Sequence, residues 1–321
     1  MNYNKIEDHE KSFESTLIDS SGNKYTCREV VDLGNGAILK KMKPATSGFF
    51  YVEETRKNMI VVHATIGVLK GDLATLTKQD SHMGVSYLIG RNGIAYELYN
   101  PKYWSYHLGM GSVGGNKSNS SRSIGIELSN MGPLKNVNGN LETVYSRQSY
   151  IDANKLTKIA PSDVYCTIDD HSAYTHVADA FRGYNYFSSY TSTQYVTLNK
   201  LVRYLSNAYS IPLNYLPDDN RNHVFPSDIS AIQFNGICSH INYRPSGKWD
   251  VGTDFNWDAI INDIKAPESK PIDVIPLDVI KAIDVPLSPN TGLPPFLVPN
   301  NVAPVEPPSI IGGFLKSLFS K

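Results

Sequence analysis

The sequence has almost no net charge, few cysteines and no long apolar run. Its 30 lysines and arginines nearly balance 31 aspartates and glutamates, and the basic residues are scattered, so the positive patch typical of nucleic-acid binding is missing. The three cysteines, Cys27, Cys166 and Cys238, show no CxxC spacing, which predicts no disulfide framework and indicates production in a reducing compartment. No window approaches the ~20 apolar residues of a membrane span. The N-terminus lacks the basic and then apolar residues of a signal peptide, so we expect a soluble protein made in the cytoplasm.

The sequence does contain a sizeable apolar fraction and many tyrosines. Hydrophobic residues make up 41% of the 321 residues, enough for the core of one elaborated domain with a tail. Short apolar runs predict strands at 59–63, 85–90, 94–98 and 123–128. Helical spacing of apolar residues predicts helices at about 68–77, 192–209 and 257–264, the second of them capped by Ser192 or Thr193. We therefore expect an α/β domain, with a long irregular region over residues 130–190. The 20 tyrosines suit grooves that hold sugars or peptides.

Residues 239–252 form a turn-rich segment that carries ligand-type side chains. Pro245 and Gly247 favour a reversal of the backbone, so His240 and Asp250 are expected to face one point, with Lys248 beside them. An imidazole nitrogen and a carboxylate oxygen are ordinary zinc ligands, and a third ligand elsewhere would leave one position for water. The alternative is a surface loop with an incidental histidine and aspartate. The upstream sequence must therefore supply a third ligand and a group that handles protons.

Two upstream strands carry candidates for these two roles. The apolar run 59–63 ends in His63, at the point where the chain leaves the sheet. In the strand 123–128 the apolar side chains face one way, while Gly125 and Glu127 face the other. A buried carboxylate at such a position needs a partner. A core histidine and a solvent-facing edge glutamate are the alternatives. Taken with the loop, these residues are the types that zinc-assisted amide hydrolysis requires.

Several motifs together resemble the type 2 class of zinc-dependent N-acetylmuramoyl-L-alanine amidases, which share a fold with peptidoglycan recognition proteins. The resemblance covers roughly residues 50 to 265. The most specific pattern is His240 followed by Lys248 eight and Asp250 ten positions later, joined to an Ile-Gly-Ile-Glu strand that contains Glu127. The other matching pieces are Val61-Val62-His63, Tyr87 to Gly93, Tyr106-His107-Leu108-Gly109, Asn116, Phe255-Asn256-Trp257 and, as in longer phage-encoded members, Arg182-Gly183-Tyr184.

The resemblance implies a fold, a reaction and a set of roles. It implies a mixed central β-sheet flanked by helices and hydrolysis of the amide between N-acetylmuramic acid and the L-alanine of the stem peptide. The implied ligands of Zn²⁺ are His63, His240 and Asp250, with Glu127 and Lys248 catalytic. The implied substrate-groove residues are His107, Asn116, Tyr87 and Arg182. Many relatives carry a tyrosine or histidine pair where this chain has Val85-Ser86, a departure that shifts the handling of water onto Glu127.

The composition divides the chain into four segments. We expect an N-terminal extension over residues 1–45 packed on the main domain, and a zinc amidase domain over 46–265. Residues 266–321 hold 11 of the 19 prolines, which predicts an extended Pro-rich linker over 266–308. Residues 309–321 place their apolar side chains on one helical face, which favours a docking peptide for a larger protein assembly or a membrane surface. A disordered tail with a few apolar residues is the alternative.

Two other functions remain open from the sequence. The first is a peptidoglycan-binding module that holds muropeptide without cutting it, and the second is a structural component of a phage or injection particle. We expect an enzyme, because Glu127 is present. We also expect it to act on the cell wall, as a phage lysin or as a wall-opening enzyme carried on a particle.

Overall fold

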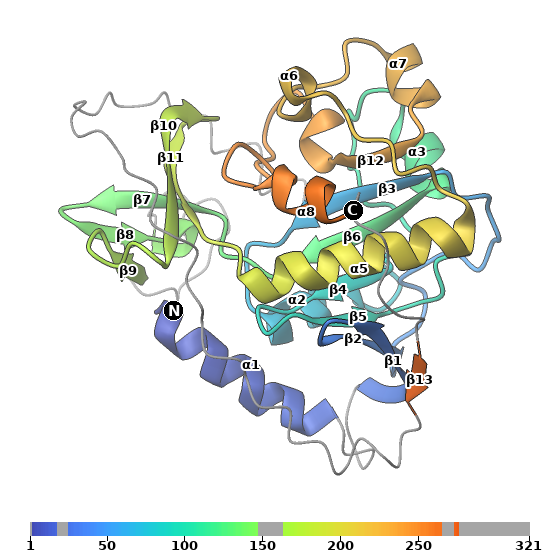
Figure 1. Cartoon of the computed structure of the whole chain (residues 1–321), viewed down its shortest axis with the longest axis horizontal. Coiled ribbons are helices and arrows are strands. Elements are labelled where there is room, and N and C mark those ends of the chain that lie inside the picture. The colour runs from blue at the N-terminus through green and yellow to red at the C-terminus, as the bar shows by residue number, and fades with distance from the viewer. Residues whose placement is uncertain (1, 18–24, 147–162, 265–272, 276–321) are drawn as a thin grey trace.

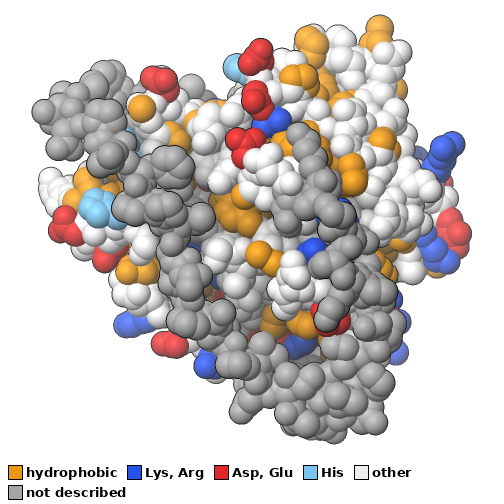
Figure 2. Space-filling view, in the orientation of Figure 1, with side chains coloured by type: hydrophobic (Ala, Val, Ile, Leu, Met, Phe, Trp, Pro, Cys, Tyr) orange, Lys and Arg blue, Asp and Glu red, His pale blue; other side chains and the backbone are white. Residues whose placement is uncertain are grey.

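The computed structural model of the chain describes residues 2–17, 25–146, 163–264 and 273–275 (Figure 1). The docking peptide expected over residues 309–321 lies outside the described residues, and so does nearly all of the expected linker. No helix among the described residues is long and apolar enough to cross a membrane. Basic and acidic side chains are interspersed on the face shown in Figure 2.

A mixed eight-stranded sheet forms the centre of the protein, which confirms the predicted α/β fold class. Parallel pairs join β12 to β3, β3 to β6, β6 to β4 and β5 to β2, whereas β4–β5, β2–β1 and β1–β13 are antiparallel. The strands run, in spatial order, β12 (Gly236–Ser239), β3 (Met59–Ala64), β6 (Ser123–Leu128), β4 (Tyr87–Ile89), β5 (Ile94–Glu97), β2 (Ala37–Pro44), β1 (Tyr25–Gly34) and β13 (Asp273–Ile275).

The two faces of this sheet are covered by different helices. Helices α5 (Ser192–Tyr209) and α8 (Trp257–Ile264) cover one face, where Val62 and Ile126 lie in the same core cluster as Leu201 (Figure 1). Helix α2 (Leu69–Leu76) covers the other face and packs against Leu88. Because side chains alternate along a strand, residues next to each other in sequence belong to different faces.

Helix α5 has the bounds that the sequence predicts, but its N-cap lies one or two residues before the predicted Ser192 or Thr193. Thr191 is its N-cap, and a capping box joins the Thr191 side chain to the backbone N–H of Gln194. The helix ends at Tyr209, and its C-cap Ser210 adopts the left-handed conformation two residues before Pro212. Its buried residues recur at helical spacing, as predicted, and form part of the core: Leu198, Leu201, Val202 and Leu205.

The N-terminal residues contribute to the central sheet as well as packing on it. Strand β2 pairs in parallel with β5, and β1 pairs with β2, so residues 25–44 add two strands to the domain. Helix α1 (Tyr3–Leu17) precedes them. Its Glu10 is fully buried and accepts a hydrogen bond from the backbone N–H of Arg91 at 2.9 Å. The sequence expectation of an extension packed on the domain understated this involvement, because the alternating apolar residues of 25–44 stand among many polar ones.

A second sheet occupies most of the stretch for which an irregular region was predicted, so that prediction was wrong for the described part. Its spatial order is β10 (Tyr174–Phe181), β11 (Tyr184–Ser188), β7 (Pro133–Val137), β8 (Asn140–Glu142) and β9 (Val164–Thr167). Tight hairpin turns at Asn138-Gly139 and Arg182-Gly183, all four residues with positive φ, join two of the pairs. The strands are short and partly polar, which left their periodicity too weak to detect.

Short helices complete the described fold. They are α3 (Asn116–Arg122), α6 (Asp218–Arg221), α7 (Asp228–Gln233) and the 3₁₀ turns η1 (Val144–Ser146) and η2 (His240–Asn242). Ala231 of α7 and Phe225 pack against Val61 and so cover the face of the sheet that α5 does not.

Candidate metal centre and active site

Three adjacent parallel strands bring the candidate ligands to one edge of the sheet. His63 lies near the end of β3 and is paired in register with Glu127 of β6. On the other side of β3, Ser239 of β12 is paired with Val62, so His240 follows at the same edge. The carboxyl ends of parallel strands are the usual position of ligand sites in open α/β sheets. Strand order therefore explains how residues 63, 127 and 240 come together.

The nitrogen and oxygen atoms of the predicted ligands converge on a single point. His63 Nδ1 lies 2.9 Å from His240 Nδ1, and His240 Nδ1 lies 2.9 Å from Asp250 Oδ2. The third side of the triangle, from His63 Nδ1 to Asp250 Oδ2, is 3.4 Å. Ligand atoms about 2.0–2.2 Å from a tetrahedral zinc ion stand about 3.4 Å apart, so this triangle is close to the size that the ion requires. All three residues are at least nine-tenths buried.

The hydrogen bonds behind the two imidazoles fix which nitrogen of each carries the proton. His240 Nε2 lies 3.1 Å from the carbonyl oxygen of Leu108, which can only accept, so Nε2 donates and Nδ1 keeps its lone pair. His63 Nε2 lies 2.9 Å from His107 Nδ1, and His107 Nε2 lies 2.8 Å from Ser123 Oγ. Ser123 Oγ donates to the carbonyl of Asn119 at 2.6 Å. Because this chain ends in a carbonyl oxygen, each member donates to the next, and His63 Nδ1 also keeps its lone pair.

Two imidazole lone pairs and a carboxylate oxygen thus face one another, which is a stable arrangement only around a cation. Burial lowers the pKa of His63 and lowers that of His240 to about 4, although the Asp250 carboxylate opposes this shift in both. Burial by itself raises the pKa of Asp250, but its interactions with His240 and Lys248 hold that pKa well below the usual value. At neutral pH both imidazoles are therefore uncharged, and no bound proton balances the negative charge of Asp250. The geometry and donor types of the three groups fit a zinc ion.

Glu127 lies beside the three candidate ligands and lines a cavity of about 220 Å³. Its Oε2 atom is buried and has no hydrogen-bond partner among the described residues. Burial and the nearby Asp250 carboxylate raise the pKa of Glu127 well above its usual value, whereas Lys248 lowers it. Lys248 also lines this cavity. A buried carboxyl group without a partner next to a cation site is suited to exchanging a proton with a bound molecule.

Comparison with known sequences identifies the family. The sequence model of the family Amidase_2, described as N-acetylmuramoyl-L-alanine amidase, matches residues 53–253. The chain belongs to this family. No curated protein matches it significantly.

Three solved structures illustrate the structural likeness to amidases. The N-acetylmuramoyl-L-alanine amidase LysC from Clostridium intestinale shares 14% identity, covers 71% of this chain and 99% of its own, and superposes with a TM-score of 0.36. An AmpD derivative shares 16% identity over 67% of this chain and 96% of its own, with a TM-score of 0.33. AmiD from E. coli was solved with anhydro-N-acetylmuramic acid-L-Ala-D-gamma-Glu-L-Lys. It shares 18% identity, covers 73% of this chain and 65% of its own, and superposes with a TM-score of 0.38. The family assignment rests on the sequence match and not on these distant likenesses.

Within this amidase-family domain, His107 lies behind a candidate ligand. The family resemblance implied a position in the substrate groove. In the structure its imidazole instead links His63 to Ser123 through the two hydrogen bonds described above. Burial and the neighbouring His63 lower its pKa well below the usual value, so the ring stays neutral and can accept at Nδ1 while it donates at Nε2. His107 is therefore placed to orient the imidazole of the candidate ligand His63.

Arg182 binds the backbone of the turn-rich segment 239–252, called the closing loop below. Its guanidinium donates to the carbonyl oxygen of Lys248 and to that of Arg244, the latter at 2.7 Å. Trp249 Nε1 donates in turn to the carbonyl of Arg182 at 3.4 Å. The hydrogen bonds of the Arg182 guanidinium are therefore with the loop that presents Lys248 and Asp250.

The two other predicted groove residues make no hydrogen bond with the candidate ligands in the described part of the chain. Asn116 begins α3 and its Oδ1 accepts from Ser120 Oγ at 2.9 Å, so it contacts its own helix. Tyr87 pairs with Ile126, one residue before Glu127, and its side chain therefore lies on the opposite face of the sheet from His63. The alternation of side chains along β4 and β6 explains this difference.

The structure adds cavity residues that the sequence did not single out. Asp72, Tyr190 and Asp254 line the same cavity as Glu127. Burial raises the pKa of Asp254 to about 7 and that of Asp72 to about 7. Asp254 lies four residues after Asp250, just beyond the closing loop, and this proximity was the one feature of the sequence that could have indicated its place at the site. Asp72 lies on α2, and nothing in its local sequence indicates that this helix borders the site.

Proposed function

We propose that the protein is a zinc-dependent N-acetylmuramoyl-L-alanine amidase that hydrolyses the amide between the lactyl group of N-acetylmuramic acid and the L-alanine of the stem peptide. The observation that carries this proposal is the convergence of His63 Nδ1, His240 Nδ1 and Asp250 Oδ2 beside the unpartnered carboxyl group of Glu127. Membership of the family supplies the substrate class.

His63, His240 and Asp250 would hold the zinc ion. When bound there, zinc polarises the amide carbonyl and lowers the pKa of water to about 7. The protein's own contribution is to keep both Nδ1 lone pairs aimed at the ion, through the His107–Ser123 chain behind His63 and the Leu108 carbonyl behind His240.

Glu127 is the proposed general base and acid. Its carboxylate accepts a proton from the attacking water and delivers it to the leaving nitrogen of L-alanine, which departs as a free amine. Burial and the Asp250 carboxylate raise the pKa of Glu127 well above its usual value, against the opposing charge of Lys248, and a raised pKa favours delivery of the proton to the leaving nitrogen.

Lys248 is the proposed electrostatic partner of the reacting carbonyl. It lines the cavity beside Glu127 and is placed by the loop that Arg182 holds. Its ammonium group stabilises the negative charge that develops on the carbonyl oxygen as the amide carbon becomes tetrahedral.

We also propose that the protein is made in the cytoplasm and acts on the bacterial cell wall, as a phage lysin or as a wall-opening enzyme carried on a particle. The phage role is supported by the sequence resemblance of residues 182–184 and the following helix to phage-encoded relatives. Detection of the protein in purified particles would distinguish the carried enzyme from a lysin released inside the host.

The decisive experiment measures hydrolysis of purified cell walls. The zinc-loaded protein is expected to release new N-terminal alanine, to stop on addition of a chelator, and to resume when zinc is restored. A Glu127→Gln variant that retains zinc serves as the matched control and is expected to be inactive. A folded, zinc-containing wild-type protein that binds walls but releases no alanine would be a binding module instead of an enzyme.

A further inference from the structure

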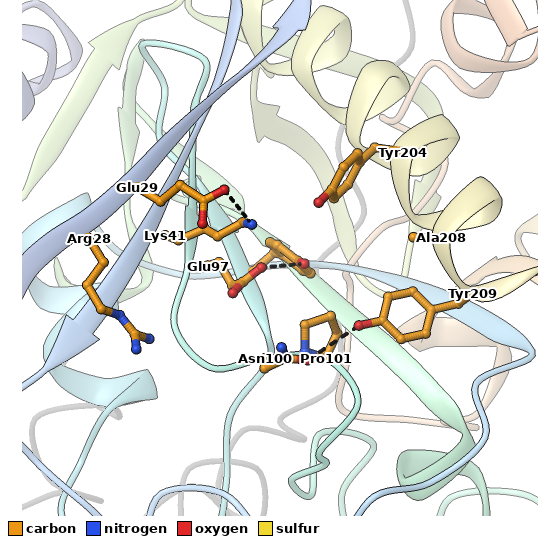
Figure 3. A pocket seen from close by; sticks show the side chains of 10 residues that line it. Arg28, Glu29, Lys41, Glu97, Asn100, Pro101, Tyr204, Ala208 and Tyr209 are labelled. Carbon is orange, nitrogen blue, oxygen red and sulfur yellow. Dashed lines mark hydrogen bonds and ion pairs between the residues drawn. The ribbon is translucent and has the colours of Figure 1, made fainter. Parts of the chain in front are cut away.

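A second cavity lies on the opposite face of the central sheet from the metal centre. It has a volume of about 370 Å³, compared with about 220 Å³ for the cavity beside Glu127. Figure 3 shows its walls: β1, β2 and the end of β5 on one side, and the C-terminal half of α5 on the other. Because α5 covers the sheet face opposite His63, this cavity and the metal centre are separated by the sheet itself.

The cavity is formed partly by residues outside the matched family region. Arg28, Glu29 and Lys41 come from β1 and β2, before the match begins at residue 53. Tyr204 and Tyr209 come from α5, within the match. The cavity therefore lies where the two N-terminal strands meet the amidase-family domain. Its volume falls within the range of about 300–1,000 Å³ that is typical of ligand sites.

A buried carboxyl group lies at the inner end of this cavity. Glu97 is only 8% exposed, and Tyr87 Oη donates to its Oε2 at 2.9 Å. Burial raises the pKa of Glu97, although the hydrogen bond from Tyr87 and the charge of Lys41 lower it. A carboxyl group in such a position is most stable when further hydrogen bonds reach it.

The outer part of the cavity presents donors and acceptors in balance. Lys41 Nζ and Glu29 Oε1 form an ion pair at 2.9 Å, and Tyr209 Oη donates to Asn100 Oδ1 at 3.4 Å. Figure 3 shows the hydroxyl groups of Tyr204 and Tyr209 directed from α5 towards these groups. With Arg28 included, two cationic and two carboxyl side chains line the site. Such a lining does not select for a strongly charged ligand, and its polarity is unsuited to an apolar one.

We propose that this cavity binds a carbohydrate, and specifically a short segment of an N-acetylated aminosugar chain. Sugar hydroxyl groups donate and accept at once, so they match a site that offers carboxylate and amide acceptors together with amine, guanidinium and phenol donors. Tyrosine rings add apolar surface for the faces of the sugar ring. The choice of an aminosugar rests on the proposed function, since this is the glycan of the wall that the amidase would cut.

The position of the cavity defines what such binding does. A glycan segment held on the α5 face cannot be the one whose amide lies beside Glu127, because the sheet stands between them. The site therefore attaches the protein to a separate segment of the same polymer and raises the local concentration of substrate around the metal centre.

The test is a titration of the full-length, zinc-loaded protein with a β-1,4-linked N-acetylglucosamine tetramer, followed by NMR and calorimetry. This probe has neither lactyl group nor peptide, so binding is independent of hydrolysis. We expect saturable binding with shift changes at the cavity, and an affinity loss of about tenfold or more in Glu97→Gln, Tyr204→Ala and Tyr209→Ala. Asn207→Ala, an exposed change on the same helix outside the cavity, is the matched control and should bind normally.

The outcomes separate this inference from the proposed function. Absence of saturable binding, or binding that is unaffected by all three folded cavity variants, would overturn the inference. Shift changes confined to the Glu127 cavity would overturn it equally, because the sugar would then occupy the active site. If the tetramer binds as expected but no alanine is released from walls, the carbohydrate site stands and the amidase proposal fails. Hydrolysis of a soluble muropeptide should stay unchanged in Tyr209→Ala.

Discussion

The hydrogen bond behind His63 allows a quantitative test of the metal centre. His107 Nδ1 accepts from His63 Nε2 at 2.9 Å, and a His107→Phe substitution would remove that acceptor while keeping a somewhat larger aromatic ring in its place. Without it, the free protein can move the proton of His63 from Nε2 to Nδ1, which faces the ligand cluster. Zinc would then have to displace this proton before it could bind.

The size of the effect follows from the loss of one buried hydrogen bond. Leaving a buried donor unsatisfied costs roughly 1–3 kcal/mol. Since about 1.4 kcal/mol corresponds to a tenfold change in an equilibrium constant, zinc affinity should fall roughly 5- to 150-fold. Loss of groups that orient metal ligands typically weakens metal binding by about 10–100-fold, which agrees with this range.

Zinc affinity is best measured by competition with a chelator, with circular dichroism confirming that each variant is folded. His176→Phe is the matched control, because His176 is exposed on β10 in the second sheet and should leave zinc binding unchanged. Ser123→Ala removes the next partner in the chain and should have a smaller effect. If His107→Phe binds zinc normally and instead raises the KM for muropeptide, then His107 belongs to the substrate groove and its role in orienting His63 is refuted.

Three further predictions concern catalysis and stability. Glu127→Gln should lower kcat by about 10²–10⁴-fold at unchanged zinc content, measured by alanine release; activity near wild type would place the general base elsewhere. Lys248→Met should lower kcat by about 10²–10³-fold, and an effect on KM alone would show that Lys248 only binds substrate. Burial raises the pKa of Glu10 from 4.5 to about 7. Between pH 4.5 and 7 the Glu10 carboxyl group is therefore protonated in the folded state and ionised in the unfolded chain. The free energy of unfolding should therefore fall as pH rises from 4.5 towards 7, by on the order of 3 kcal/mol for this group. Denaturant titrations should show a flatter pH dependence in Glu10→Gln and no such change in Glu7→Gln, an exposed position on the same helix; equal slopes in all three proteins would contradict the assignment.

Local sequence patterns were enough to establish the fold class, the family resemblance and the residue types of the candidate metal centre. This was possible because the apolar runs of the central strands are strong, and because His240, Lys248 and Asp250 lie within one short loop whose turn residues are evident. His63 and Glu127 were also recoverable, since each occupies a position on an apolar strand where a polar side chain needs a functional reason.

The remaining features depend on which strands become neighbours and which face each side chain occupies. The register of β3 with β6 and β12 brings residues 63, 127 and 240 together, and no local pattern encodes that register. The same alternation moves Tyr87 to the opposite face and into a different cavity. His107 became a positioning residue only through contacts with His63 and Ser123 that are distant in sequence. Local patterns record the periodicity of each element, whereas hydrogen-bond partners and shared cavities are set by how the elements pack together after folding.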